Sequence, residues 1–186
     1  MAKWNIDPDH AVGEFTIKHM MVTPVHGQFN QVSGTIIFDP TDPASASVEV
    51  EIDVAGIYTG VDRRDNHLRS ADFFGVDKFP KMFFKSTLIE VAGLNHCKVT
   101  GNLTIHGIKR SVLFDVTFAG PSSFFDDELK ETYTTFGFRA TTSINREDFD
   151  MKWYTPIEDG GFMVGKHVDI VFNAEADLIK NKRRIK

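Results

Sequence analysis

Seven histidines are the first side chains in this sequence that could bind a metal ion or move a proton. They lie at His10, His19, His26, His67, His96, His106 and His167. None of them forms the His-x-His, His-x-x-x-His or His-Glu-x-x-His spacing that brings two ligands to one metal. Convergence of Asp7, His10 and His19 in space is the alternative route to a metal site. We expect no metal, and we expect hydrogen-bonded structural or pocket histidines.

Nucleophilic catalysis has equally little support. The one cysteine, Cys97, lies among alternating strand residues without an evident His or Asp partner, which indicates a buried structural thiol. No Gly-x-Ser-x-Gly elbow is present. The glycine-containing segment 160–165 lacks the Lys-Ser/Thr pair and the strand-to-helix context of a phosphate-binding loop, so it is interpreted as an ordinary loop. The sequence therefore favours a protein that is not an enzyme and needs no cofactor.

A group of charged side chains directly precedes a group of apolar ones. The charged group is Arg63, Arg64, Asp65, His67 and Arg69, and the apolar group is Phe73, Phe74, Phe79, Pro80, Met82, Phe83 and Phe84. Arginine suits a phosphate or carboxylate head group, and successive phenylalanines suit a hydrocarbon chain beneath it. Their adjacency favours a site for an amphiphilic small molecule. The alternative is an exposed helix whose phenylalanines tether it to the core.

A β-sheet must position these clusters, because apolar and polar residues alternate with period two over much of the chain. The pattern is clearest in segments 47–54, 97–106, 110–119 and 168–178, and less regular strands are expected at 12–19, 28–38, 81–91 and 133–144. About eight strands with short connections, such as the hairpin at 106–109, predict an antiparallel meander that closes to remove its edges. Loops are expected at 39–43, 120–123 and 145–165, where Gly, Pro and Asp gather.

One segment has helical spacing instead. Val61, Asp65, Leu68 and Asp72 recur at intervals of three or four, and Thr59 or Asp62 could cap the start, so the pattern predicts a helix over 61–74. A helix inserted in such a meander covers one end of the barrel. We therefore expect the pocket mouth beside this helix and the 145–165 loop.

The composition limits the kinds of molecule that this protein is expected to bind. The chain has 17 Phe against 2 Trp and 3 Tyr, which indicates dry core or pocket surface, since Phe has no polar atom to satisfy. The net charge of -5 gives no general attraction to nucleic acid or to an anionic membrane. The basic end 180–186 is interpreted as a solvated tail. The first residues lack signal-peptide character and no stretch reaches the length of a membrane span, so a soluble, cytoplasmic protein of one domain over 1–186 is expected.

Five ordered motifs resemble those of the YceI-like family of lipocalin-type polyisoprenoid-binding proteins. They are Trp4–His10 leading to Phe15–His19, Val25–Phe29, Arg64–Phe74 closing at Phe79-Pro80, Gly101–Ile108, and Ala140–Phe149. The resemblance implies an eight-stranded barrel with a long internal tunnel for an isoprenoid chain, such as a polyprenyl phosphate or quinone. It also implies a homodimer. Two positions depart from the family pattern, because Gly75 replaces the usual Asp and Asp150 replaces the usual Gly.

These lines together predict an all-β fold: a single antiparallel eight-stranded lipocalin-like barrel with one inserted helix near the pocket mouth. The expected function is non-catalytic binding, storage or transport of an isoprenoid or fatty lipid. The candidate ligand-binding residues are His19, Phe29, Arg64, Asp65, His67, Leu68, Phe73, Phe74, Phe79, Phe84, Leu103, Phe114, Phe136, Phe138 and Trp153. The alternatives are a partner-binding barrel with a filled core and an enzyme with a site at His19, Asp65 and His67.

Overall fold

Strands form most of the computed structural model, which describes residues 1–128, 130–158 and 160–179. The strands are β1 (Ala2–His19), β2 (Thr23–Phe29), β3 (Val32–Phe38), β4 (Ser47–Asp53), β5 (Ile57–Tyr58), β6 (Lys81–Gly93), β7 (His96–Ile105), β8 (Ile108–Asp126), β9 (Glu131–Asn145) and β10 (Val164–Leu178). The α-helix is α1 (Asp62–Arg69), and the 3₁₀ turns are η1 (Pro43–Ser45), η2 (Val54–Gly56) and η3 (Arg146–Phe149). The expected basic tail 180–186 lies outside the described residues.

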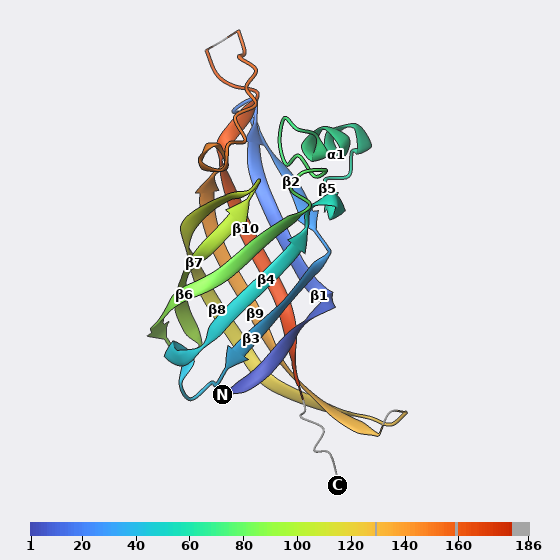
Figure 1. Ribbon diagram of the computed structural model, residues 1–186, viewed down its shortest axis with the longest axis vertical. Helices are drawn as coiled ribbons and strands as arrows, with labels where there is room; N and C mark the ends of the chain where they lie inside the picture. Colours follow the sequence, from blue (N-terminus) through green and yellow to red (C-terminus); the bar gives the residue numbers. More distant parts are fainter. Residues whose placement is uncertain (129, 159, 180–186) are drawn as a thin grey trace.

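The strands close into a barrel (Figure 1). The hydrogen-bonded order runs β10-β9-β8-β7-β6-β4-β3-β1, and β1 also pairs with β10. All of these pairings are antiparallel, from Trp4↔Leu178 to His19↔Val164 at the closing seam. The predicted eight-stranded antiparallel barrel with one inserted helix is therefore confirmed. Closure gives each strand a partner on both sides, so few backbone donors are left along the barrel wall.

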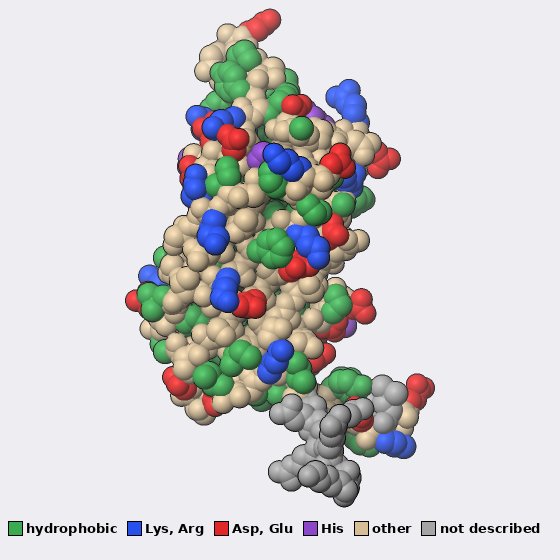
Figure 2. All heavy atoms as spheres, in the orientation of Figure 1, with side chains coloured by type: hydrophobic (Ala, Val, Ile, Leu, Met, Phe, Trp, Pro, Cys, Tyr) green, Lys and Arg blue, Asp and Glu red, His purple; other side chains and the backbone are tan. Residues whose placement is uncertain are grey.

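The alternating pattern separates the two faces of the wall. In β4, Val48, Val50 and Ile52 face the interior, while Glu49 and Glu51 face outward. The outward carboxylates form ion pairs with lysines of β6, Glu51 with Lys81 and Glu49 with Lys85. Figure 2 shows basic and acidic side chains close together over the visible face of the barrel. Such exposed pairs contribute little stability, so the interior face must supply most of it.

One end of the barrel is filled by aromatic side chains that belong to strands. Trp4 of β1 meets Phe136 of β9 edge-to-face at 5.0 Å, and Phe38 of β3 meets Phe136 at 5.2 Å. The Trp4 indole donates a hydrogen bond to the Phe38 carbonyl at 3.3 Å. All three side chains are buried, as is Ala176 of β10. This end is therefore closed by a packed core on regular sheet.

The other end is covered by segments outside the strands. Helix α1 and the turns of residues 70–80 lie beside this end, and the segments 150–158 and 160–163 extend beyond it (Figure 1). Beneath them, Phe29, Val54, Ile57 and Phe149 form a buried cluster with Met151. The two ends of the barrel are thus closed in different ways.

The strand boundaries differ from the sequence prediction in two places. The strand expected at 28–38 is two strands, β2 and β3, because β1 shifts register between Ile6 and Ala11 and its two halves pair with different partners. The loop expected at 120–123 lies inside β8, which continues to Asp126 as an arm paired with β9. Pro121 is tolerated there because the ladder shifts register between Ala119 and Ser122. β1 also begins at Ala2 rather than near residue 12.

The helix is shorter than predicted. It covers Asp62–Arg69, and residues beyond Ser70 form successive tight turns. Neither Thr59 nor Asp62 caps it: the cap residue is Val61, without a side-chain hydrogen bond. Helical spacing up to Asp72 was misleading because turns that fold back on a helix end keep a similar three- to four-residue rhythm. The predicted β7–β8 hairpin is confirmed, with positive φ at His106 and Gly107.

Gly101 of β7 is predicted to tolerate no side chain. A Cβ there would lie 2.3 Å from the Phe84 ring and 2.6 Å from the Lys85 carbonyl oxygen, so Gly101→Ala should lower the free energy of unfolding by about 1–3 kcal/mol. Gly137→Ala in β9 is the matched control, since the nearest atom to its Cβ would be 4.0 Å away. Urea unfolding of both variants checks the prediction. Equal stabilities for the two variants would contradict it.

Candidate functional site

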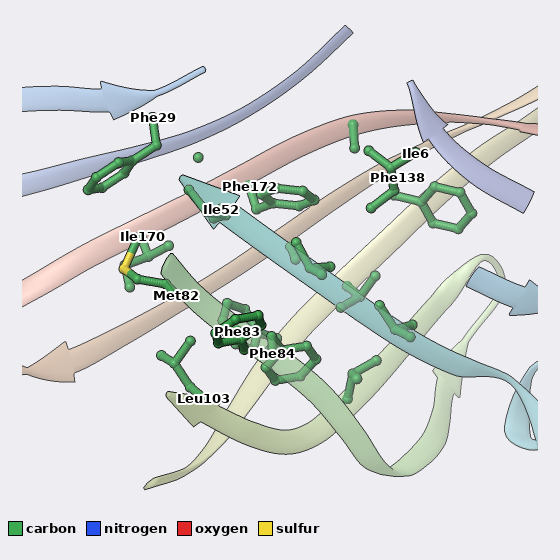
Figure 3. A pocket seen from close by; sticks show the side chains of 18 of the residues that line it. Ile6, Phe29, Ile52, Met82, Phe83, Phe84, Leu103, Phe138, Ile170 and Phe172 are labelled. Carbon is green, nitrogen blue, oxygen red and sulfur yellow. The ribbon is translucent and has the colours of Figure 1, made fainter. Parts of the chain in front are cut away.

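A long hollow lies inside the barrel. Its cavity volume, taken as the space open to the centres of water-sized spheres, is about 210 Å³. Side chains from β1, β2, β3, β4, β6, β7, β8, β9 and β10 converge on it, as Figure 3 shows for Phe29, Ile52, Phe84, Leu103, Phe138 and Phe172. The side chains drawn there carry carbon and the Met82 sulfur, without nitrogen or oxygen. The interior is therefore a hydrocarbon-lined cavity.

Partial exposure of inward-facing side chains shows that the barrel is not filled. Ile52, Phe84, Phe138, Ile170 and Phe172 line the hollow, and each retains accessible surface although it points away from the outer solvent. In the packed end, by contrast, Phe136 is 1% exposed. A core packed to ordinary density would bury the first group as completely as the second. The accessible surface of these residues is the wall of the cavity.

Hydrophobic contact is the main interaction that this wall can offer. Among the described residues that border the hollow, Glu14 is the one with a charged side chain. It is exposed, and its carboxylate accepts a hydrogen bond from the Asn173 side chain at 3.0 Å. Cys97 also belongs to the wall, is buried, and has a thiol pKa raised by burial. Little inside the barrel could orient a polar group.

Six of the candidate residues from the sequence line the cavity: Phe29, Phe74, Phe84, Leu103, Phe114 and Phe138. Phe136 packs in the closed aromatic end instead. Leu68 packs against the cluster beneath α1, and the Phe79 ring meets the His106 ring edge-to-face, with ring centroids 4.6 Å apart. His19 ends β1 opposite Val164, away from the hollow's lining.

Arg64 and Asp65 of α1 are occupied by contacts within the protein. Asp65 is 3% exposed, and its carboxylate accepts hydrogen bonds from the backbone N–H of Thr59, at 3.0 Å, and from the Thr59 hydroxyl. Arg64 donates to the Thr59 hydroxyl at 2.7 Å and to the Thr59 carbonyl at 2.8 Å. Arg69 similarly donates to the carbonyls of Ala55 and Ile57. These side chains hold the η2–β5 segment against the helix.

His67, Phe73 and Trp153, named here the aromatic clasp, meet at the same end of the barrel. The ring centroids of His67 and Phe73 lie 5.0 Å apart, those of His67 and Trp153 5.2 Å, and those of Phe73 and Trp153 5.5 Å. His67 Nε2 also lies 2.9 Å from a carboxylate oxygen of Asp72. The aromatic clasp joins α1 and its following turn to the 150–163 loop.

Arg146 fixes the base of that loop, a role the sequence did not reveal. It is 3% exposed and donates to the backbone carbonyls of Gly165, at 2.8 Å, of Val164, at 3.3 Å, and of Met151. Burial lowers the pKa of its guanidinium below the ordinary value. An arginine at a strand end is a common surface residue, so nothing in the sequence alone marks it as buried.

The two departures from the family pattern both occupy left-handed backbone. Gly75 has φ of 55°, which glycine adopts without strain, and Asp150 has φ of 61°. Asp is among the non-glycine residues that tolerate this region. Its carboxylate pairs with Lys152 at 2.6 Å, and that hydrogen bond lowers the pKa of Asp150. Asp150 therefore preserves a glycine-like turn.

Apart from Leu103, the aliphatic and sulfur-containing lining residues were not among the sequence candidates, and neither were Phe15, Phe118 and Phe172. The aliphatic and sulfur-containing residues include Ile6, Ile36, Val48, Val50, Ile52, Met82, Cys97, Val99, Ile144, Met151 and Ile170. The sequence did contain a signal for many of these residues, since segments 47–54 and 168–178 each have one apolar face. Alternation identifies the inward face but does not distinguish a filled interior from a hollow one.

Within the described residues, no three His, Cys, Asp or Glu side chains are grouped so that they could hold a metal ion. No α-helix in the described part of the chain is long and apolar enough to span a membrane.

Comparisons with known proteins agree with this fold. A model of the YceI-like domain family matches residues 4–176. A UPF0312 protein of Staphylococcus aureus strain bovine RF122 is 38% identical over 178 residues, which cover 96% of this chain and 98% of that protein.

Solved structures give the same result. Burkholderia cenocepacia BcnA is 27% identical with a TM-score of 0.76, over 91% of this chain and 98% of BcnA. The Campylobacter jejuni YCEI protein is 28% identical with a TM-score of 0.71, over 88% and 91% of the two chains. A polyisoprenoid binding domain from Saccharophagus degradans has a TM-score of 0.68 at 13% identity, over 96% and 100%, and at that identity the likeness shows the fold alone.

Cys97 offers a chemical probe of the cavity wall. Because burial raises its thiol pKa, less thiolate forms at a given pH, and the rate of alkylation by N-ethylmaleimide should rise with pH to a midpoint above that of an unfolded cysteine. Alkylation rates between pH 7 and 10.5, with the urea-unfolded chain as control, measure this. The same midpoint in both states would contradict the assignment of Cys97 to a desolvated wall.

Proposed function

Because the chain belongs to the YceI-like family, we propose that it is a non-catalytic lipid-binding protein that encloses an isoprenoid or similar long apolar chain within its barrel. The ligand would be an amphiphile of the polyprenyl phosphate or quinone type, held for storage or transport. The observation that carries the proposal is the hollow, hydrocarbon-lined interior.

The shape of the cavity supports a long ligand. On β7 the lining runs from Cys97 to Ile105, which at roughly 3.3 Å per residue is about 26 Å along the strand. Strands in such barrels tilt by about 40°, so the lined length along the barrel axis is about 20 Å. An extended acyl or isoprenoid chain matches this length better than a compact ligand does.

Energetics assign different roles to the two ends of such a ligand. Each buried methylene contributes about 0.8 kcal/mol, so a 20-carbon chain would gain roughly 16 kcal/mol before ordering costs. A hydrogen bond to a charged group adds only about 1.5–3 kcal/mol. The apolar chain should therefore determine affinity, and the head group should determine orientation at the cavity's end.

Lipid extracted from the purified protein is expected to contain one class of long-chain amphiphile in stoichiometric amount. Native mass spectrometry of the full chain, before and after solvent extraction, measures both the mass added and its loss. Geranylgeraniol added to the extracted protein should raise its Tm. A protein that is reproducibly empty, and whose Tm does not respond, would be inconsistent with lipid binding.

Filling the cavity should weaken binding without unfolding the barrel. Ala140 of β9 lines the cavity, so Ala140→Trp is expected to weaken binding of an apolar fluorescent probe at least tenfold while leaving Tm within a few degrees. Ala119→Trp is the matched control, because Ala119 is exposed on the neighbouring strand β8 and does not border the cavity. Equal probe affinities for the two variants would place the binding site elsewhere.

A further inference from the structure

The two segments that cover the α1 end of the barrel reach the cavity with neighbouring residues. Phe74, next to Phe73, lines the cavity and meets Phe29 edge-to-face at 5.6 Å. Met151, two residues before Trp153, also lines the cavity. Each segment therefore places one residue in the cavity wall and one in the aromatic clasp.

Among the described residues, no backbone hydrogen bond joins these two segments to each other. Each is tied to the barrel, since the Val54 N–H donates to the Pro80 carbonyl at 2.9 Å and the Met20 N–H donates to the Met163 carbonyl at 2.8 Å. The N–H groups of Phe73, Phe74, Gly75 and Val76 donate to carbonyls of residues 68–70, and that of Lys152 donates to Asp150.

At the opposite end, Trp4, Phe38 and Phe136 belong to β1, β3 and β9, whose ladders would have to break before their rings could move apart. Separation of the two segments at the α1 end needs loss of side-chain contacts, whereas separation of the three rings at the aromatic end needs loss of sheet. The turn η1 also borders the cavity at the aromatic end, through Pro43 and Ala46.

We infer that the cavity is entered between Phe74 and Met151, and that the aromatic clasp of His67, Phe73 and Trp153 controls the rate at which a ligand passes. This inference rests on the proposed lipid-binding function and adds its regulation. When the clasp parts, the 70–80 turns and the segment 150–154 move apart and Phe74 separates from Met151. The barrel strands keep their register throughout, and Arg146 keeps the loop attached at its base.

Trp153 is the residue on which the clasp depends, because it is the one member from the 150–154 segment and makes both ring contacts that cross between the segments. Trp153→Ala should speed release of bound N-phenyl-1-naphthylamine about tenfold in stopped-flow fluorescence. Association should accelerate as well, since the open state favours both directions, so Kd should change less than about threefold. Trp153→Phe should restore most of the slow exchange.

Two controls separate the clasp from general loosening. Tyr154→Ala removes an adjacent, exposed aromatic ring and should leave the rate unchanged. Ser45→Ala loosens η1, which borders the other end through Pro43 and Ala46, by removing a hydroxyl that donates to the Asp42 carbonyl at 2.9 Å. Acceleration by Ser45→Ala but not by Trp153→Ala would overturn the inference and place the entrance at η1.

A readout that needs no bound lipid distinguishes failure of the entrance from failure of the proposed function. Alkylation of Cys97 in the cavity wall should be faster in Trp153→Ala than in the wild-type protein or Tyr154→Ala. Unchanged alkylation and unchanged probe release overturn the inference even if lipid binding holds. Faster alkylation in a protein that binds no apolar probe supports the entrance and contradicts the lipid-binding function.

Discussion

The width of an eight-stranded barrel is the constraint on which the rest of this structure depends. Such a barrel is just wide enough for its inward side chains to fill, or to leave room for a small ligand. Here Trp4, Phe38 and Phe136 fill one end, whereas Val50, Ile52 and Ala140 leave the middle open. The cavity follows from which side chains stand at these levels of the barrel, and not from any distortion of the sheet.

The two ends of the barrel differ for the same reason, namely which side chains stand at each level of the barrel. At one end, large rings are attached to strands that pair on both sides, so the core and the sheet support each other. At the other end, α1 and two irregular segments cover the barrel. Polar side chains hold them in place, since Arg64 and Asp65 form hydrogen bonds with Thr59, and Arg146 forms hydrogen bonds with the base of the loop. Three members of the charged cluster that resembled a head-group site, Arg64, Asp65 and Arg69, thus make contacts within the protein. Burial of Asp65 and Arg146 is compensated by nearly complete hydrogen bonding.

The sequence predicted the barrel because alternation in 47–54 and 168–178 survives on one face even where the interior is hollow. It did not predict the split between β2 and β3, since that depends on a register shift in their partner strand. The many phenylalanines, whose rings have no polar atom to satisfy, predicted a dry interior, and six of the candidate residues line the cavity. Ile52 and Ile170 belong to the wall equally and were missed. Which of these residues contact a ligand stays a prediction. His67, Phe73 and Trp153 meet only through tertiary packing, which no spacing in the chain records.

Pairing of β1 with β10 joins the strands made first and last in the barrel. During synthesis, the inward faces of the earlier strands therefore remain accessible until β10 has left the ribosome, and the long sequence separation makes this closure a slow step. An apolar molecule present at that moment could be enclosed without passing any entrance. The lipid bound in a freshly made protein would then reflect the lipids available during folding. The lipid bound later would reflect exchange with lipids from the surroundings.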